Sequence, residues 1–203
     1  MNPYEVGHWI DGKLHRGSGT QAQDIFNPAT GQVQGQVLLG DATDLDVAVA
    51  AATRVQASWA HTPPLQRSRV LFRFLEIVQA RRDELAECLV REHGKTLPDA
   101  QGEVARGIEN IEFATGMPQL LKGEYTEQIS RGMDAWSVRQ PVGIAAGITP
   151  FNFPAMVPLW MFPLAIGCGN CFILKPSERD PSASLLMARW LKEAGRDAHG
   201  LAH

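Results

Sequence analysis

The spacing of hydrophobic residues changes along the chain and predicts a short β-rich segment followed by helices. Residues 8–13 read as a strand that runs into an Asp-Gly turn, and residues 24–31 as a strand that ends in a Pro/Gly loop. From Thr43, which we expect to be the N-cap, apolar positions repeat at helical spacing as far as Trp59. The pattern predicts an amphipathic surface helix with its stripe at Leu45, Val49, Ala52 and Val55.

Three more helices are predicted before the main sheet. The first follows the break at Pro63 and Pro64, the second stops at Gly94, and the third is opened by Pro98 at about its first position and ends at Gly116. Their apolar positions are Leu71, Phe74, Leu75 and Val78, then Leu85, Leu89 and Val90, then Val104, Ile108, Ile111 and Phe113.

Residues 123–139 are typical of a two-stranded hairpin that stands off the body. Polar residues separate their apolar ones, and the pair Arg131-Gly132 marks the turn. An isolated hairpin is marginally stable in water, so we expect a partner to cover this arm.

The segment after the hairpin follows a βαβα order. Residues 142–148 are a continuous apolar run of strand length, 155–166 a helix, 171–174 a second apolar strand and 181–194 another helix. This order is typical of a parallel sheet with crossover helices, so the sequence predicts an α/β fold.

Composition narrows the class of protein. The 203 residues include 19 basic and 22 acidic side chains, for a formal net charge of −3, with no run of like charge, so we expect no nucleic-acid partner. Residues 1–25 lack the pattern of a secretory signal, and Cys88, Cys168 and Cys171 are too few for a disulfide framework. These features predict a cytoplasmic protein.

An uncharged stretch, residues 141–174, raises the alternative of a membrane span. Prolines interrupt it repeatedly, and its longest helical segment, residues 155–168, is shorter than the ~20 residues that a bilayer requires. We therefore expect no membrane partner.

Polar residues follow the first strand of the predicted sheet at residues 149–154. Open α/β sheets bind ligands at the carboxyl ends of their strands. The Asn152 side-chain amide can donate two hydrogen bonds, which suits an aldehyde oxygen that becomes an oxyanion. The alternative is that Asn152, near two prolines, is a turn residue that bonds its own backbone.

A second polar segment follows the next strand. Lys175 could bond sugar hydroxyls or phosphate, and Glu178 could accept a hydrogen bond from a ribose. The alternative is a solvated turn that caps the next helix. No G-x-G-x-x-G follows the first strand, so a nucleotide site here would be built differently from the usual dinucleotide fold.

Cys168 and Cys171 have the C-x-x-C spacing of a redox or metal-binding pair. They are predicted at a helix C-terminus and a strand start, in apolar surroundings that raise a thiol pKa, whereas reactive pairs lie at helix N-termini. We expect two buried structural cysteines and no metal site.

Arg106 and Gly107 lie in the middle of the fourth predicted helix. Spacing alone makes Arg106 a surface residue that pairs with Glu103 or Glu109. A glycine inside a helix costs up to ~1 kcal/mol, so Gly107 indicates that another segment approaches closely.

Two linked motifs resemble the aldehyde dehydrogenase superfamily at that family's own spacing. They are the run from Gly147 to Pro154 (Gly-Ile-Thr-Pro-Phe-Asn-Phe-Pro) and the run from Lys175 to Glu178 (Lys-Pro-Ser-Glu), and the resemblance extends from about Gly7 to Gly195. The segments most similar to the CoA-acylating methylmalonate semialdehyde dehydrogenases are residues 92–96, 102–110 and 150–163, including Phe151, where many relatives have Trp.

The resemblance implies roles for individual residues, with NAD as cofactor, coenzyme A as co-substrate and a small-molecule aldehyde as substrate. It makes Asn152 the oxyanion-hole amide and Arg106 the residue that binds the substrate carboxylate. The implied NAD contacts are Lys175 and Glu178 at the adenosine ribose, Thr149 and Phe151 near the cofactor, and Arg179 beside them.

The resemblance also implies an architecture. The fold would be aldehyde-dehydrogenase-like, with N-terminal helices and the first βαβα units of a Rossmann-like parallel sheet. Residues 1–121 would be the first part of the NAD-binding domain, 122–140 an oligomerisation hairpin, and 141–203 the start of the sheet. We expect a homo-oligomer, a dimer or a tetramer, in the full-length family.

The implied reaction is oxidation of an aldehyde to an acyl-CoA in valine and pyrimidine catabolism. The family's catalytic Cys, base Glu and Gly-rich segment are expected beyond His203, and residues 196–203 depart from the family pattern. We therefore expect a truncated N-terminal portion that is inactive alone. The alternatives are a hydrolytic aldehyde dehydrogenase and a non-catalytic nucleotide-binding or assembly fragment.

Overall fold

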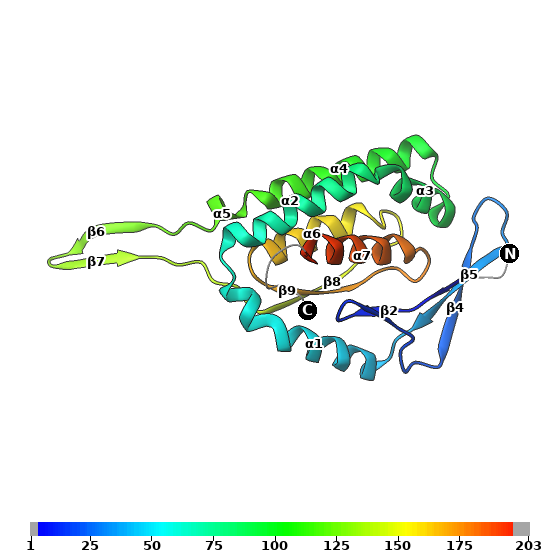
Figure 1. Ribbon diagram of the computed structural model, residues 1–203, viewed down its shortest axis with the longest axis horizontal. Coiled ribbons are helices and arrows are strands. Elements are labelled where there is room, and N and C mark those ends of the chain that lie inside the picture. The colour runs from blue at the N-terminus through cyan, green and yellow to red at the C-terminus, as the bar shows by residue number, and fades with distance from the viewer. Residues whose placement is uncertain (1–3, 197–203) are drawn as a thin grey trace.

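The computed structural model describes residues 4–196, which form a helical body, a β-rich end and a long arm (Figure 1). The departure expected over residues 196–203 lies outside the described residues except for the helical backbone of residue 196. The described elements confirm the predicted α/β class and most of the predicted element order.

The N-terminal segment builds two small sheets. Strands β1 (Tyr4–Val6), β4 (Gln21–Phe26) and β5 (Val33–Leu39) pair in the order β1-β5-β4, and β2 (His8–Ile10) forms a hairpin with β3 (Lys13–His15). The Asp-Gly turn is confirmed, with both Asp11 and Gly12 at positive φ. Strand β5 was not predicted, because Gly35 interrupts its alternation. A β-carbon at Gly35 would meet the ring of Tyr4 at 2.7 Å.

Helix α1 (Ala42–His61) is the predicted surface helix, but its N-cap is Asp41 rather than Thr43. The Asp41 carboxylate accepts from the backbone N–H groups of Thr43 and Asp44, and the Asp44 side chain accepts from the Asp41 N–H, which forms a capping box. None of the α1 residues is fully buried, and Leu45 and Val49 of the predicted stripe are exposed.

Four further helices follow α1 in the helical body. They are α2 (Pro64–Ala80), α3 (Arg82–His93), α4 (Leu97–Thr115) and the short α5 (Met117–Leu120). Helix α3 ends as predicted, with Gly94 in the left-handed conformation at φ 85°. Helix α4 is capped by Thr96, so Pro98 takes the second helical position rather than the first.

The predicted hairpin is present as β6 (Tyr125–Ser130) and β7 (Met133–Trp136), and it projects from the body (Figure 1). Gly132 in its turn has φ 70°. Tyr125, Ile129 and Trp136 are all exposed. The arm therefore carries apolar side chains that no described part of the chain covers.

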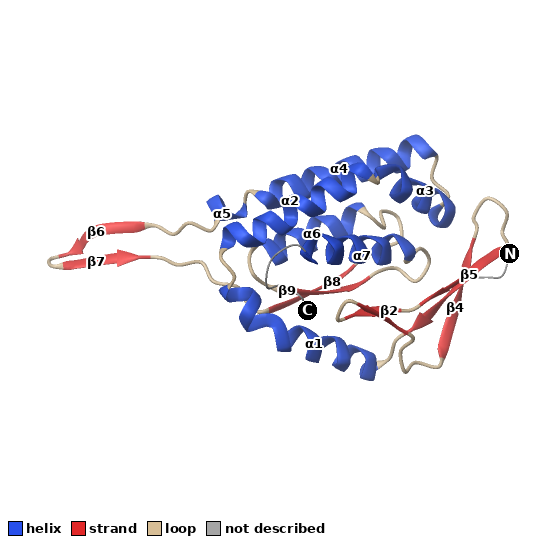
Figure 2. Ribbon diagram, viewed as in Figure 1, coloured by secondary structure: helices blue, strands red, loops and turns tan. Residues whose placement is uncertain are grey.

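The βαβα segment consists of β8 (Ile144–Ile148), α6 (Met156–Gly167), β9 (Cys171–Lys175) and α7 (Ser182–Arg196). Strands β8 and β9 are parallel, as predicted. Helix α1 lies on one side of this strand pair, and α6, α7 and the α2–α4 layer lie on the other (Figure 2). The main core joins these helices through residues such as Phe74, Leu89, Ile111, Leu159 and Met187.

The close approach predicted at Gly107 is confirmed. Helices α4 and α6 cross there, and a β-carbon at Gly107 would lie 2.5 Å from Leu159 Cδ1. Within residues 4–196, no helix combines the length and the apolar content needed to cross a bilayer.

Candidate functional site

Two loops meet at the carboxyl end of the parallel strand pair. Residues 149–154 follow β8 and residues 176–181 follow β9, and the backbone N–H of Thr149 donates to the carbonyl of Lys175 at 3.1 Å. Parallel pairing in register therefore places both predicted polar segments at one edge, where α/β sheets bind ligands.

Asn152 lies at the exposed tip of the first loop. Its backbone carbonyl accepts a hydrogen bond from Lys95 Nζ at 2.8 Å. Its side-chain amide bonds no residue in the described part of the chain, so the alternative of a turn residue bonding its own backbone does not hold. The amide is free to donate to a ligand.

Phe151, next to Asn152, contacts a charged side chain and an aromatic one. The Arg179 guanidinium carbon lies 4.6 Å from the centre of the Phe151 ring, and the His93 ring stacks on Phe151 with a centroid separation of 6.4 Å. Burial lowers the pKa of His93, and the nearby Lys95 lowers it further. These contacts link both loops to the end of α3.

Lys175 and Glu178 form an ion pair on the second loop. Lys175 Nζ donates to Glu178 Oε2 at 2.8 Å, and both groups are accessible to solvent. This hydrogen bond is the main reason that the pKa of Glu178 is lowered. The pair offers a donor and an acceptor at the carboxyl end of β9.

Thr149 is buried, and its hydroxyl oxygen has no hydrogen-bond partner among the described residues. Buried polar atoms are usually bonded, so an unpaired hydroxyl at the end of β8 marks this edge as a place where a ligand or a water can bind.

Sequence reasoning overlooked the residues behind the Asn152 loop. Glu103 of α4 is fully buried, and its Oε1 accepts from the backbone N–H groups of Ala155 at 2.9 Å and Met156 at 3.1 Å. Its other oxygen is paired with Lys95. Both residues lie in segments that carry the resemblance, and charge spacing offered Glu103 only as a surface partner of Arg106.

Two further buried carboxyl groups are Asp180, within the β9 loop, and Glu92 of α3. Glu92 accepts from the Tyr4 hydroxyl and from the Ser182 backbone N–H. Burial raises the pKa of Asp180 to about 7, and the neighbouring charge of Glu92 adds to that rise. One Asp180 oxygen has no partner in the described chain.

The structure does not join Arg106 to these loops. Arg106 is exposed on α4, and the alternative ion pair with Glu103 is wrong because Glu103 is buried and paired with Lys95. No ion pair between Arg106 and Glu109 occurs among the described residues.

The thiol pKa values of Cys168 and Cys171 are raised, as predicted, but the two residues are less buried than predicted. Cys168 ends α6 and Cys171 begins β9, and both are partly rather than fully buried. Burial raises the pKa of both thiols, and it raises the pKa of Cys88 to about 12. Residues 4–196 contain no group of three His, Cys, Asp or Glu side chains that could hold a metal ion.

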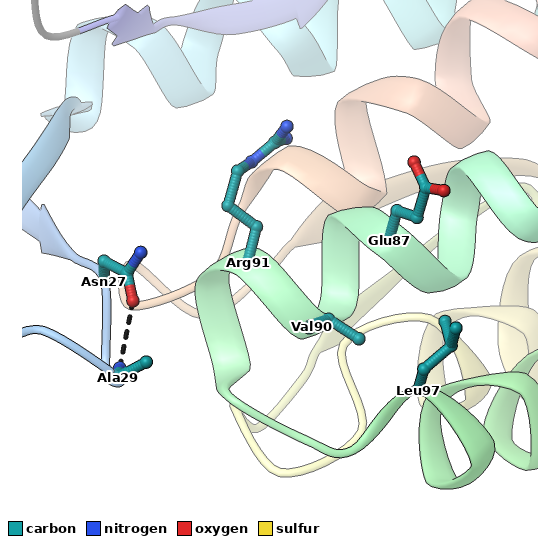
Figure 3. A pocket seen from close by; sticks show the side chains of 6 residues that line it. All are labelled: Asn27, Ala29, Glu87, Val90, Arg91 and Leu97. Atoms are coloured by element: carbon teal, nitrogen blue, oxygen red, sulfur yellow. Dashed lines mark hydrogen bonds between the residues drawn. The ribbon is translucent and has the colours of Figure 1, made fainter. Parts of the chain in front are cut away.

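A separate surface hollow of about 370 Å³ lies between the β4–β5 turn and the end of α3 (Figure 3). It is lined by Asn27, Ala29, Glu87, Val90, Arg91 and Leu97. None of these is a predicted site residue, so the hollow is distinct from the loop edge.

Comparison with known proteins decides the family. The sequence profile of the aldehyde dehydrogenase family matches residues 15–201. The chain belongs to the aldehyde dehydrogenase family. A malonate-semialdehyde dehydrogenase of Pseudomonas aeruginosa is 52% identical over 188 residues, which cover 93% of this chain and 38% of that protein. The mitochondrial acylating methylmalonate-semialdehyde dehydrogenase of Arabidopsis thaliana is 45% identical over 95% of this chain and 32% of its own length.

Solved structures of the family agree. A methylmalonate-semialdehyde dehydrogenase from Oceanimonas doudoroffii superposes with a TM-score of 0.92 at 52% identity, over 95% of this chain and 39% of the other. A structure from Sinorhizobium meliloti 1021, provisionally given the same name and complexed with NAD, superposes with a TM-score of 0.93 at 54% identity over the same shares. This aldehyde dehydrogenase chain therefore spans about a third to two fifths of the length of these relatives.

Proposed function

We propose that this chain is the amino-terminal part of an NAD-dependent, CoA-acylating malonate- or methylmalonate-semialdehyde dehydrogenase. The observation that carries the proposal is that the unpaired side-chain amide of Asn152 and the Lys175–Glu178 pair lie on loops that leave the same edge of a parallel strand pair. The identity of about half to semialdehyde dehydrogenases supports the substrate class.

Asn152 is the proposed oxyanion donor. A side-chain N–H that is exposed and unpaired can bond an aldehyde oxygen as negative charge develops on it. Lys95 donates a hydrogen bond to the Asn152 carbonyl, which fixes the backbone that carries the amide.

Lys175 and Glu178 are the proposed contacts to the adenosine ribose of NAD, with Thr149, Phe151 and Arg179 near them. The donor set fits a ribose, because its hydroxyl groups both accept and donate hydrogen bonds and the ion pair supplies both kinds of partner. NAD, when bound, accepts the hydride that the aldehyde loses. The relative complexed with NAD supports this assignment.

Arg106 is the proposed partner of the substrate carboxylate. It is exposed, so its guanidinium is available for a two-pronged bond to a semialdehyde acid. The substrate names of the relatives, malonate and methylmalonate semialdehyde, both imply such a carboxylate.

The nucleophile is proposed to lie in a segment that corresponds to the part of the relatives outside the matched region. A thiolate is needed for covalent attack on the aldehyde and for acyl release to CoA, and burial raises the pKa of all three thiols here. This observation also favours a second candidate for the 203-residue chain alone, a nucleotide-binding or assembly fragment without turnover.

The proposed organisation has residues 1–121 and 141–203 in the NAD-binding domain and residues 122–140 as an oligomerisation arm. The exposed apolar side chains of β6 and β7 support the arm's role, because a partner subunit would cover them. Acyl-CoA formation from these semialdehydes would place the complete homo-oligomeric enzyme in valine or pyrimidine catabolism.

The test is to join residues 1–195 of this chain to the part of the Pseudomonas aeruginosa relative that follows its matched region. We expect this completed enzyme to form NADH from malonate or methylmalonate semialdehyde and to need CoA for turnover, and the 203-residue chain to form none. Turnover without CoA would favour the hydrolytic alternative. Turnover by the 203-residue chain would contradict the placement of the nucleophile.

A further inference from the structure

Helix α6 begins without a capping residue of its own. Its N-cap is Ala155, which has no side-chain acceptor, and Pro154 precedes it. The first N–H groups of a helix need outside partners, and here Glu103 of α4 supplies one oxygen to two of them, those of Ala155 and Met156. A carboxylate is favoured at this end of a helix by the helix dipole.

Lys95 connects this cap to the Asn152 loop. Its ammonium group is paired with the second Glu103 oxygen, donates to the Asn152 carbonyl at 2.8 Å and lies 4.2 Å from the centre of the Phe153 ring. The ammonium therefore holds the loop at two consecutive residues, while Glu103 holds the two residues that start the helix.

Both charges are removed from solvent. The Glu103 side chain is 0% exposed and that of Lys95 is 9% exposed. Burying such a pair costs desolvation energy, and an apolar pair of similar volume is often at least as stable. An apolar pair could not accept the two helix N–H groups or donate to the Asn152 carbonyl, which indicates that the network serves placement of the loop rather than bulk stability.

We propose that Lys95 and Glu103 are positioning residues, which fix the backbone of Asn152 and so aim its side-chain amide at the reacting oxygen. This inference rests on the proposed function, in which that amide stabilises the oxyanion. Neither residue touches the substrate. They act through Asn152, and a shift of the amide by about 1 Å is enough to cost about 100-fold in rate.

The first test measures amide hydrogen exchange in the 203-residue chain. Lys95→Met should raise exchange of the Ala155 and Met156 amides about tenfold or more, because Glu103, which accepts from both, loses the cation that also bonds the Asn152 carbonyl. Exchange in the α2 segment 70–78 should stay within about twofold. Lys95→Arg, which keeps a cation and its donors, should restore most of the protection. The matched control is Lys13→Met, on an exposed lysine of β3.

Two exchange results would overturn the proposal. One is unchanged exchange of the Ala155 and Met156 amides in Lys95→Met. The other is an equal rise at these amides and in residues 70–78, because that pattern shows a general role in stability rather than a role in placing the loop.

The second test is a double-mutant cycle in a complete relative that carries the same Lys, Glu and Asn at the corresponding positions. With Asn152 present, Lys95→Met should lower kcat about 10- to 100-fold with little change in KM. In the Asn152→Ala background, Lys95→Met should lower kcat no more than about twofold further. Equal losses in both backgrounds would overturn positioning through Asn152.

The cycle separates the two proposals. If Asn152→Ala alone leaves kcat unchanged, the proposed oxyanion role fails, and the positioning role in catalysis fails with it. If Asn152→Ala lowers kcat but Lys95→Met does not, only the positioning role fails.

Discussion

Gly107 of α4 lies against Leu159 of α6 so closely that a β-carbon at residue 107 would be 2.5 Å from Leu159 Cδ1. Leu159 is fully buried in the main core, where close packing makes an added carbon costly. At Gly102 of the same helix a β-carbon would enter open space, with no neighbouring atom within 4 Å. The two glycines therefore occupy one helix with opposite steric surroundings.

Gly107→Ala should destabilise the fold. Alanine favours a helix by up to ~1 kcal/mol over glycine, but an extra carbon in a packed core typically costs about 1–3 kcal/mol. Gly102→Ala, the matched control, should gain the helix term alone. Urea unfolding of both variants checks this, and a gain of equal size in both would contradict the tight α4–α6 crossing.

Removal of either partner of the Lys175–Glu178 pair should weaken NAD binding. Lys175→Met and Glu178→Gln should each raise the Kd about tenfold, the effect of losing a hydrogen bond to a charged group. The control is Glu193→Gln, which breaks the surface ion pair between Arg81, at the end of α2, and α7. Titration calorimetry on the chain checks this, and an equal Kd for all variants would show that the β9 loop is only a solvated turn.

Asp180 should make stability depend on pH. Its pKa is raised to about 7 in the folded chain, mainly by burial, against about 4 in an unfolded chain. The folded state therefore holds the proton between those values, so this contribution is complete below about pH 4 and is lost as pH rises through about 7.

Asp180→Asn removes that titration. From about pH 4.5 to about pH 8, the free energy of unfolding of the variant should rise relative to the unaltered chain by a few kcal/mol. Denaturant unfolding at the two pH values measures this difference. A difference that does not change with pH, or that falls, would contradict the burial of an unpaired Asp180 oxygen.

Arg106 should distinguish charged from neutral aldehydes. In the completed enzyme, Arg106→Leu should lower kcat/KM for malonate semialdehyde by ~2–5 kcal/mol of transition-state binding and leave propanal almost unaffected. Arg106→Lys keeps the charge but loses the two-pronged geometry, so its loss should be intermediate. Equal losses for both aldehydes would refute a carboxylate contact and leave Arg106 as a surface residue of α4.

The sequence predicted the elements whose signals are local. The stop at Gly94 and the hairpin turn at Gly132 each follow from residues within or beside the element. The parallel pair of β8 and β9 follows from the βαβα order of consecutive elements. The N-cap of α1 was placed two residues late because Asp41, Thr43 and Asp44 are all favourable caps, and only the side-chain bonds select Asp41.

The network behind the candidate site could not be predicted in the same way. Glu103 and Ala155 are 52 residues apart in sequence, and neither carries a local signal that the two will meet. Charge periodicity assigned Glu103 to the surface beside Arg106, whereas the packing of α4 on α6 buries it. Tertiary packing, rather than helix periodicity, decides the partner of a buried charge.

The measurement that bears most directly on the proposed function is kcat of the completed enzyme with Asn152→Ala. Removal of one oxyanion donor typically costs about 10²–10³ in kcat, so NADH formation from methylmalonate semialdehyde and CoA should fall by about that factor. Asn110→Ala, which removes an amide bonded within α4, should stay within about twofold of the unaltered enzyme. A kcat for Asn152→Ala equal to that of Asn110→Ala would contradict the assignment of the oxyanion site to this loop.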